Sequence, residues 1–554
     1  MKEAKQVNMS PWERLIGLLK LERKDILQVI YYAIFSGLLS LTLPLGIQAI
    51  VNLIQGAQVS TSWIVLVILV TLGVAFVGIL QLMQMRIIET IQQRIFTRAS
   101  FEFTYRFPKI KMTELRNYYP PELANRFFDV LSIQKGLAKI LIDIPTAILQ
   151  IIFALILLSF YHPFFIVFGI ILLLLIYVVF KFTLQRGMET SLLESKNKYK
   201  VAHWIQEVAR AVVSFKLSGK TSLAVNKNDD LVEDYLKARE SHFRILIIQF
   251  IQMISFKVVV TAGLLLIGGL LVLNQEMNIG QFVAAEIIIL LVTASVEKLI
   301  LGLESFYDIL TSLEKMGQVV DKDLEDQAGD RPEFKENFSL ELDNISYKVP
   351  NKQNSILKNI SFKISPKSRL LIKGESGSGK SSLLQIIGGI IEPTKGKIYL
   401  DKYMLSTINL NYYRSHLGLS LANETPFEGT IRENITFGNP EVSDEQLMWA
   451  IENVGLYQFI KESPQGLNTI LYPEGKQIPF TIAKKIVLAR AIVDKPQILI
   501  LEDPLEHFEL EEVDRIISFL TDPSNPWALV VVSMSNDWSK SCTQVITLKK
   551  GEII

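Results

Sequence analysis

The first 300 residues of the chain alternate between long apolar runs and polar, charge-rich stretches. A helix needs about 20 apolar residues to cross the hydrocarbon layer of a membrane. Six runs reach or approach that length: residues 26–54, 63–85, 144–160, 163–180, 245–273 and 279–303. The alternative is a set of buried helices in a large soluble core, and it is weak because the first run carries no charge. The pattern therefore predicts an all-α transmembrane domain of six helices.

The polar stretches between these runs differ in length and charge, and the difference predicts their side of the membrane. Three are short and contain no Lys or Arg: residues 55–62, 161–162 and 274–278. Residues 86–139 and 181–244 are long and rich in both. Since cytoplasmic loops carry the excess of Lys and Arg, both termini are expected to be cytosolic. Helical patterning in the long loops predicts helices that continue beyond the membrane, with short cross-helices near residues 118–126 and 210–220.

From residue 338 onward, short strand-like runs alternate with helical stretches. Strands are expected at residues 339–342, 370–372, 397–400, 417–421, 498–501, 529–532 and 545–548. This order predicts an α/β domain with a largely parallel sheet at its centre. A polar segment with Gly329 and Pro332 precedes it and predicts a linker. The expected organisation is a cytosolic N-terminal segment (1–24), a transmembrane domain (25–310), a linker (311–337) and the α/β domain (338–554).

One stretch of the α/β domain matches the phosphate-loop pattern G-x-x-x-x-G-K-[ST] between a predicted strand and a predicted helix. It consists of Gly374, Glu375, Ser376, Gly377, Ser378, Gly379, Lys380, Ser381 and Ser382. The glycines let successive N–H groups and a helix N-terminus point at phosphate, Lys380 reaches the outer phosphates, and the Ser381 hydroxyl is a ligand for Mg²⁺. A glycine-rich turn with a chance lysine is disfavoured by the flanking strand and helix. We therefore predict nucleotide binding.

Composition narrows the classes of protein further. The 554 residues include 57 Lys plus Arg against 56 Asp plus Glu, so the charge gives no indication of a nucleic-acid partner. A hydrophobic content of 49% is high for a soluble enzyme and fits a protein embedded in the lipid bilayer. The single cysteine, Cys542, forbids an intramolecular disulfide, which suits a cytosolic domain. Residues 1–24 are basic and polar, so no cleavable signal peptide is expected.

Six spans with long cytosolic loops, a linker and a phosphate-loop domain resemble the layout of a half-size ATP-binding cassette (ABC) exporter. Residues 429–435 read G-T-I-R-E-N-I, as in that family, and residues 488–491 resemble the end of the helix after its signature motif. Residues 495–501 are similar to its Walker B strand. Through residues 41–52 and 268–286, the membrane half is most similar to transporters of type I secretion systems, which export peptides and proteins. The resemblance covers nearly the whole chain.

The resemblance implies a multi-pass protein of the bacterial inner membrane with ATP and Mg²⁺ as cofactors and a peptide or protein as substrate. Ser381 and Glu502 fall on the metal-binding positions, and Glu502 and Asp503 on the catalytic ones. The adenine-stacking aromatic falls on Tyr347 or on Val349, and the choice between them stays open. The implied partners are a second copy (homodimer) or another half-transporter (heterodimer), with a periplasmic adaptor protein as a further candidate. No nucleic acid is expected.

Several positions depart from the pattern of the family. Its L-S-G-G-Q signature falls on residues 478–482, where Phe480 and Thr481 replace the glycines that let the backbone approach γ-phosphate. Its Walker B aspartate falls on Glu502 and its catalytic glutamate on Asp503. Because this order is inverted, one side chain is a methylene too long and the other a methylene too short, and we expect both carboxylates to be misplaced.

Three further positions lack the side chain of the family. The switch histidine falls on Met534, the Q-loop glutamine on Ala422, and the aspartate after Walker B on Glu509. A thioether cannot bond γ-phosphate as imidazole does. The sequence therefore predicts ATP binding with weak hydrolysis and leaves two functions open. One is a half-transporter, and the other is a degenerate pseudo-ATPase subunit that acts as a scaffold or ATP-sensing regulator of an active ABC partner.

Two charged residues lie within the last two predicted spans. At 1.5 Å per residue, Lys257 lies about 18 Å from the inner end of its span, and Glu286 about 10 Å from the outer end. We therefore expect no pair between them. Lys257 is expected near the inner interface, where its stem can snorkel. Glu286 is expected to face the translocation cavity, because facing lipid is costly, and a buried structural partner is the alternative.

Overall fold

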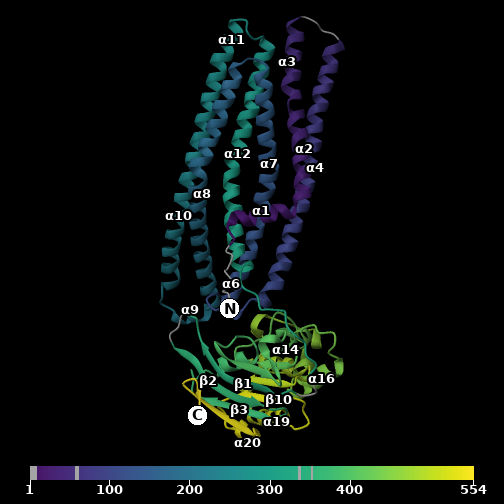
Figure 1. Cartoon of the computed structure of the whole chain (residues 1–554), viewed down its shortest axis with the longest axis vertical. Helices are drawn as coiled ribbons and strands as arrows, with labels where there is room; N and C mark the ends of the chain where they lie inside the picture. The colour runs from purple at the N-terminus through teal and green to yellow at the C-terminus, as the bar shows by residue number, and fades with distance from the viewer. Residues whose placement is uncertain (1–8, 57–60, 335–337, 351–353) are drawn as a thin grey trace. The chain divides into compact units, whose positions relative to one another are not determined.

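The computed structural model describes residues 9–56, 61–334, 338–350 and 354–554, which form two compact units (Figure 1). A helical unit comprises Met1–Lys109 and Asn117–Lys322, and an α/β unit comprises Ile110–Arg116 and Asp323–Ile554. Parts of the predicted N-terminal segment, of the first short loop and of the predicted linker (residues 335–337) lie outside the described residues.

The helical unit consists of long helices joined by short ones. Its main helices are α1 (Pro11–Leu21), α2 (Arg23–Ser40), α3 (Thr42–Gln55), α4 (Thr61–Arg106), α7 (Asp129–Ser159), α8 (Phe164–Arg210), α10 (Leu223–Gly263), α11 (Gly269–Leu273) and α12 (Ile279–Val320). The predicted cross-helices are confirmed as α6 (Pro120–Ala124) and α9 (Val212–Ser218). Helices α4 and α8, of 46 and 47 residues, exceed a membrane span by far, as predicted. Helix α12 continues through residues 311–320, the start of the predicted linker.

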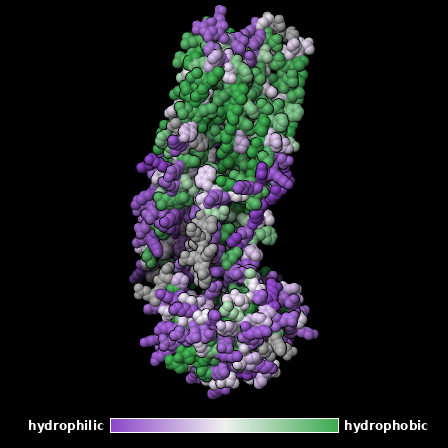
Figure 2. Space-filling model, viewed as in Figure 1, coloured by the Kyte–Doolittle hydropathy of each residue, from purple (hydrophilic) through white to green (hydrophobic). Residues whose placement is uncertain are grey.

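Among the residues that the structure describes, five helical segments are long and apolar enough to cross a membrane. They are Arg23–Gln55, Thr61–Lys109, Pro120–Ser159, Leu223–Leu273 and Ile279–Val320. In α8, the apolar stretch found among the described residues is Phe164–Leu174, which is shorter than a span, so the sixth span predicted at residues 163–180 is not confirmed. Figure 2 shows hydrophobic side chains covering the upper part of this unit, where α3, α4 and α11 lie in Figure 1. The helical unit thus has the composition of a multi-pass transmembrane domain.

The two charged residues predicted within the last spans, Lys257 and Glu286, differ in their contacts. Lys257 on α10 forms an ion pair with Glu297 on α12, at 2.5 Å between Nζ and Oε2. As predicted, Lys257 does not pair with Glu286. The partner Glu297 was not foreseen. Glu286 is half-buried and has no hydrogen bond or ion pair with any residue that the structure describes, so its exposure to a translocation cavity stays a prediction.

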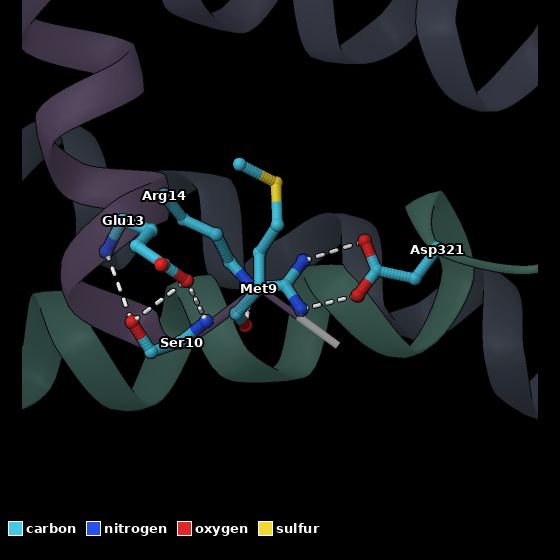
Figure 3. Close-up of polar contacts among 5 residues, drawn as sticks. All are labelled: Met9, Ser10, Glu13, Arg14 and Asp321. Carbon is cyan, nitrogen blue, oxygen red and sulfur yellow. Dashed lines mark hydrogen bonds and ion pairs between the residues drawn. The ribbon is translucent and has the colours of Figure 1, made fainter. Parts of the chain in front are cut away.

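Helix α1 lies across the long helices and is fastened to the end of α12 (Figures 1 and 3). Ser10 and Glu13 form a capping box that starts the helix. The Arg14 guanidinium donates two hydrogen bonds to the carboxylate of Asp321, one of them 2.8 Å from Nη1 to Oδ1. Gly317 makes room for the guanidinium, because a Cβ there would lie 2.2 Å from Arg14 Nη1. A bidentate ion pair over a glycine therefore fixes α1 against α12.

The α/β unit is built around a six-stranded sheet in the order β12-β11-β3-β10-β9-β6. Its strands are β3 (Arg369–Gly374), β6 (Leu417–Ser420), β9 (Ile498–Glu502), β10 (Ala528–Val532), β11 (Gln544–Lys549) and β12 (Glu552–Ile553). All neighbours from β11 to β6 are parallel, and β12 is antiparallel to β11. Strands β9 and β10 are buried throughout, as expected of apolar runs covered on both faces. The largely parallel central sheet is confirmed.

A second sheet in the order β2-β1-β4-β5 is antiparallel, so the unit as a whole is mixed. Its strands are β1 (Leu340–Lys348), β2 (Ser355–Ile364), β4 (Lys395–Leu400) and β5 (Tyr403–Met404), and β7 (Gly429–Thr430) pairs separately with β8 (Ile470–Leu471). The helices are α5 (Met112–Leu115), α13 (Lys380–Ile387), α14 (Leu410–Arg414), α15 (Ile431–Thr436), α16 (Asp444–Asn453), α17 (Tyr457–Glu462), α18 (Phe480–Ile492), α19 (Leu510–Leu520) and α20 (Asp537–Ser541).

Candidate nucleotide-binding site

The carboxyl ends of three neighbouring strands bring the predicted site residues together. The phosphate loop follows β3, Glu502 is the last residue of β9, and Ser533 follows β10. These three strands are adjacent and parallel in the sheet. Ligands of open parallel sheets bind outside the carboxyl ends of the strands. The fold therefore places the predicted phosphate-binding and hydrolytic segments at one edge.

Glycines hold the phosphate loop in a tightly curled form. Gly374, Gly377 and Gly379 have φ values of +156°, +81° and +101°, a region that favours glycine. A Cβ on Gly374 would lie 2.3 Å from the carbonyl oxygen of Leu548, and one on Gly379 would lie 2.8 Å from Leu357 Cδ2. Two of the three glycines are thus required by close packing as well as by backbone conformation. The loop shape that the motif needs is present.

The polar groups of the loop fit a polyphosphate. Lys380 begins α13, and its Nζ donates to the carbonyl oxygens of Gly374 at 2.8 Å and Glu375 at 2.9 Å. The Ser378 side chain is 4% exposed, and its hydroxyl has no hydrogen-bond partner among the described residues. Such a buried, unpaired hydroxyl is costly unless a ligand satisfies it. An ammonium and an unpaired hydroxyl therefore lie beside backbone N–H groups, as phosphate binding requires.

Other residues of the loop lie at its surface. Glu375, Ser376 and Gly377 are exposed, and Ser382 is half-buried in the first turn of α13. Their backbone groups are therefore accessible from solvent, which suits a ligand that docks onto the loop from outside.

Glu502 lies against the predicted metal ligand. The hydroxyl of Ser381 donates to Glu502 Oε1, and the N–H of Ala422 donates to Glu502 Oε2 at 3.2 Å. The extra methylene therefore does not keep this carboxylate away from Ser381, contrary to the expectation from the sequence. No cluster of three or more His, Cys, Asp or Glu side chains suited to a metal occurs in the described ranges. Ser381 and Glu502 fit Mg²⁺, which takes few protein ligands and completes its shell with water and phosphate oxygens.

Asp503 follows Glu502 in a strained conformation with φ +41°, and its N–H donates to the carbonyl of Val532 at 2.9 Å. Burial raises the pKa of Asp503, a hydrogen bond with Ser533 opposes the rise, and the nearby Glu502 carboxylate adds to it. A partly buried carboxyl with a raised pKa is suited to proton transfer.

Lys484 on α18 is a site residue that sequence reasoning missed. The side chain is 5% exposed, and its Nζ donates to the carbonyl oxygen of Ala422. Burial lowers the pKa of Lys484, and the carboxylates of Glu506 and Glu424 oppose that shift. The feature of the sequence that could have identified Lys484 is a lysine inside an apolar helix that follows the signature position. The backbone of Ala422 is thus held by Glu502 on its N–H side and by Lys484 on its carbonyl side.

The remaining departures from the family pattern lie at the surface. Helix α18 begins at Phe480, with Pro479 as its N-cap and no side-chain cap. The Phe480 ring is half exposed and packs edge-on against His507, with 5.6 Å between ring centroids. Met534 is 64% exposed. A bulky side chain therefore stands at the start of α18, where the signature of the family would leave bare backbone.

The two candidates for adenine stacking are buried. Tyr347 lies on β1 with 6% exposure, and its hydroxyl accepts a hydrogen bond from Arg116 Nη1 at 3.3 Å. Val349 is 3% exposed in the same apolar core. Neither presents an open face, so adenine stacking by Tyr347 or by Val349 stays a prediction.

Comparison with known families covers both units. Residues 26–296 match the model of the ABC transporter transmembrane region, and residues 357–506 match the ABC transporter model. The second match includes the phosphate loop and Glu502. The chain therefore belongs to the ABC transporter family and combines the membrane region of that family with its nucleotide-binding domain.

Within the family, the chain resembles exporters of type I secretion. It is 29% identical over 307 residues to the alpha-hemolysin translocation ATP-binding protein HlyB of Escherichia coli O157:H7, which covers 55% of this chain and 43% of that protein. It is 26% identical over 354 residues to the leukotoxin translocation ATP-binding protein LktB of Mannheimia haemolytica, covering 63% and 49%. The chain thus matches about half the length of these curated relatives.

A solved structure shares the fold. It is described as the structure of a bacterial Atm1-family ABC exporter with ATP bound. The TM-score is 0.85 at 16% identity, with 96% of this chain and 94% of that chain covered. At this identity, the likeness concerns the fold alone.

Proposed function

We propose that this chain is a half-transporter that binds Mg²⁺ and ATP and exports a peptide or protein across the bacterial inner membrane. The observation that carries the proposal is the phosphate loop, in which the Ser381 hydroxyl donates to Glu502, Lys380 bonds to loop carbonyls, and the Ser378 hydroxyl has no partner among the described residues. The type I secretion relatives support a protein substrate. A complete exporter would require a dimer, with a second copy or with another half-transporter, and a periplasmic adaptor is a further candidate partner.

The membrane arrangement forms part of the same proposal. Six spans, including residues 163–180, would place both termini in the cytosol, because the two long polar loops carry the Lys and Arg. The organisation would comprise segment 1–24, membrane domain 25–310, linker 311–337 and nucleotide-binding domain 338–554.

In this function, binding and hydrolysis depend on different residues. Lys380 would exchange two carbonyl partners for phosphate oxygens, and Ser381 and Glu502 would hold Mg²⁺, which supplies charge neutralisation at the outer phosphates. Asp503 would orient water, although its side chain is short for that task. Met534 offers no donor to γ-phosphate. Positioning errors near 1 Å cost about a hundredfold in rate, so intrinsic hydrolysis should be weak.

A regulatory pseudo-ATPase is the second candidate. The observation that favours it is Phe480, whose exposed ring occupies the place where the family leaves bare backbone. Such a subunit would bind ATP, turn over little or none, and act as a scaffold or ATP sensor for an intact ABC partner.

Steady-state ATPase of the purified full chain tests the proposal. We expect slow turnover by the parent. Glu502→Asp, Asp503→Glu and Met534→His together should bind ATP about as before and remain slow until residues 478–482 are also changed to L-S-G-G-Q. Vigorous, vanadate-sensitive turnover by the unmodified chain would refute weak hydrolysis. Stimulation of an intact partner without export by this chain would favour the pseudo-ATPase.

A further inference from the structure

The helical unit contains an open, apolar cavity of about 420 Å³ beside α1. Its walls include Trp12 of α1, Ile148 of α7, Ile176 of α8 and Gly302 with Phe306 of α12. The rings of Trp12 and Phe306, which both belong to the lining, lie 4.9 Å apart. The lining is aliphatic and aromatic, so water would find few partners there. An apolar ligand is the occupant that such a lining favours.

The cavity lies in the half of the membrane layer nearer to α1. At 1.5 Å per residue, Ile148 lies about 16 Å from the end of α7 at Ser159, and Ile176 lies about 18 Å from the start of α8. Leu299, also in the lining, lies about 30 Å from the start of α12. The hydrocarbon layer is about 30 Å thick. Ile148 and Ile176 therefore lie just past its middle, counted from these helix ends, and Leu299 lies at its far boundary. Trp12 is a residue type that prefers such boundaries.

A second cavity of about 400 Å³ lies next to the first. Both are lined by Trp12, Leu184 and Phe306. The second adds Lys181, Gln185 and Glu189, which follow one another at four-residue intervals on one face of α8. Lys181 is exposed and forms no ion pair within the described part of the chain; its Nζ lies 5.6 Å from the centroid of the Tyr177 ring, which also lines the first cavity. An apolar cavity thus lies next to a lysine that has no carboxylate partner among the described residues.

We propose that the two cavities form one binding site for a phospholipid, with an acyl chain in the apolar cavity and an anionic headgroup beside Lys181. Volume decides against a helix of a second copy. A helix about 10 Å in diameter would fill about 420 Å³ with roughly one turn, whereas a thin acyl chain can extend along the cavity. The site changes from an apolar lining, through the aromatic ring of Trp12, to the cation Lys181. This order matches the chemistry of a phospholipid from tail to headgroup.

Photolabelling of the full chain in lipid nanodiscs tests the site. The probes are phosphatidylglycerol and phosphatidylethanolamine that carry a diazirine on one acyl chain, and the labelled peptides are mapped after proteolysis. The filling variant is Gly302→Leu, because a Cβ on Gly302 meets only Ile144 Cγ1, at 3.9 Å, and a larger side chain would enter the cavity. The matched control is Gly78→Leu on α4, where a Cβ meets nothing within 4 Å.

We expect label on the peptides of Trp12 and Phe306 in the parent and in Gly78→Leu, and a several-fold loss in Gly302→Leu. Lys181→Gln should keep the label and lose the preference for phosphatidylglycerol, whereas Lys196→Gln, further along the same helix, should not. Thermal unfolding of every variant checks the fold. Equal labelling of parent and Gly302→Leu would overturn the site, as would crosslinks from this region to a second copy. Equal lipid preference in parent and Lys181→Gln would overturn the headgroup assignment.

Discussion

Replacing Lys380 by alanine should remove much of the ATP affinity and leave the fold intact. In the structure, the ammonium is half-buried and bonded only to the carbonyl oxygens of Gly374 and Glu375 among the described residues. The bond to Gly374 is partly buried and the bond to Glu375 is exposed, so water can replace the ammonium at these carbonyls. Removal of the side chain therefore leaves no deeply buried orphan group.

The magnitude follows from the contacts that Lys380 would make to phosphate. Hydrogen bonds to charged groups contribute about 1.5–3 kcal/mol each, and 1.4 kcal/mol corresponds to tenfold in affinity. Because the ammonium must first leave two carbonyl partners, only one such bond is counted as net gain. We expect Lys380→Ala to raise the Kd for Mg·ATP by about 10- to 150-fold.

Calorimetric titration of the purified full chain with Mg·ATP measures this change. Lys397→Ala is the matched control, because Lys397 is an exposed lysine on β4 of the same unit. The midpoints of thermal unfolding without nucleotide should agree among the three proteins. Equal affinity in Lys380→Ala and the parent would show that the loop does not bind phosphate as its geometry indicates.

Three further outcomes follow from the structure. Asp503→Asn should unfold at a higher temperature than the parent at neutral pH, because burial raises the pKa of Asp503; the gap should vanish as the pH falls through that raised pKa to the ordinary aspartate range, and a pH-independent gap would contradict this. Asp321→Asn should lower the free energy of unfolding in denaturant titrations by about 1–3 kcal/mol, since Arg14 loses a bidentate partner, and unchanged stability would count against the clamp. Glu286→Cys in a Cys542→Ser background should react with a water-soluble thiol reagent in at least one nucleotide state; protection in all states would place Glu286 away from the cavity.

The parts of the fold that follow local rules could be predicted from the sequence. Apolar runs predicted the long helices, and the spacing of glycines and lysine predicted the phosphate loop between β3 and α13. Strand β2 was missed because Lys358, Asn359 and Lys363 interrupt its apolar pattern, whereas in the structure it pairs with β1 along most of its length. Its stability comes from a neighbour distant in sequence, which periodicity does not show.

The candidate site was predictable in its loop and less so in its surroundings. From side-chain length, we expected the carboxylate of Glu502 to be misplaced. The side chain can bend by changing rotamer, and its carboxylate accepts hydrogen bonds from both Ser381 and Ala422. Lys484 lies 62 residues from Ala422 in the sequence, so only the tertiary fold brings them together. The pairing of Lys257 with Glu297 depends in the same way on how two helices pack, which the charge count of each span does not reveal.

The contacts at Ala422 bear on how this position tolerates mutation. Both neighbours use its peptide groups: Glu502 accepts from the N–H, and Lys484 donates to the carbonyl. The side chain takes no part, so the residue type at 422 can drift over evolutionary time without loosening the link between β9 and α18. In a saturation library, proline is the one residue that lacks the N–H, and it should stand out from the other replacements.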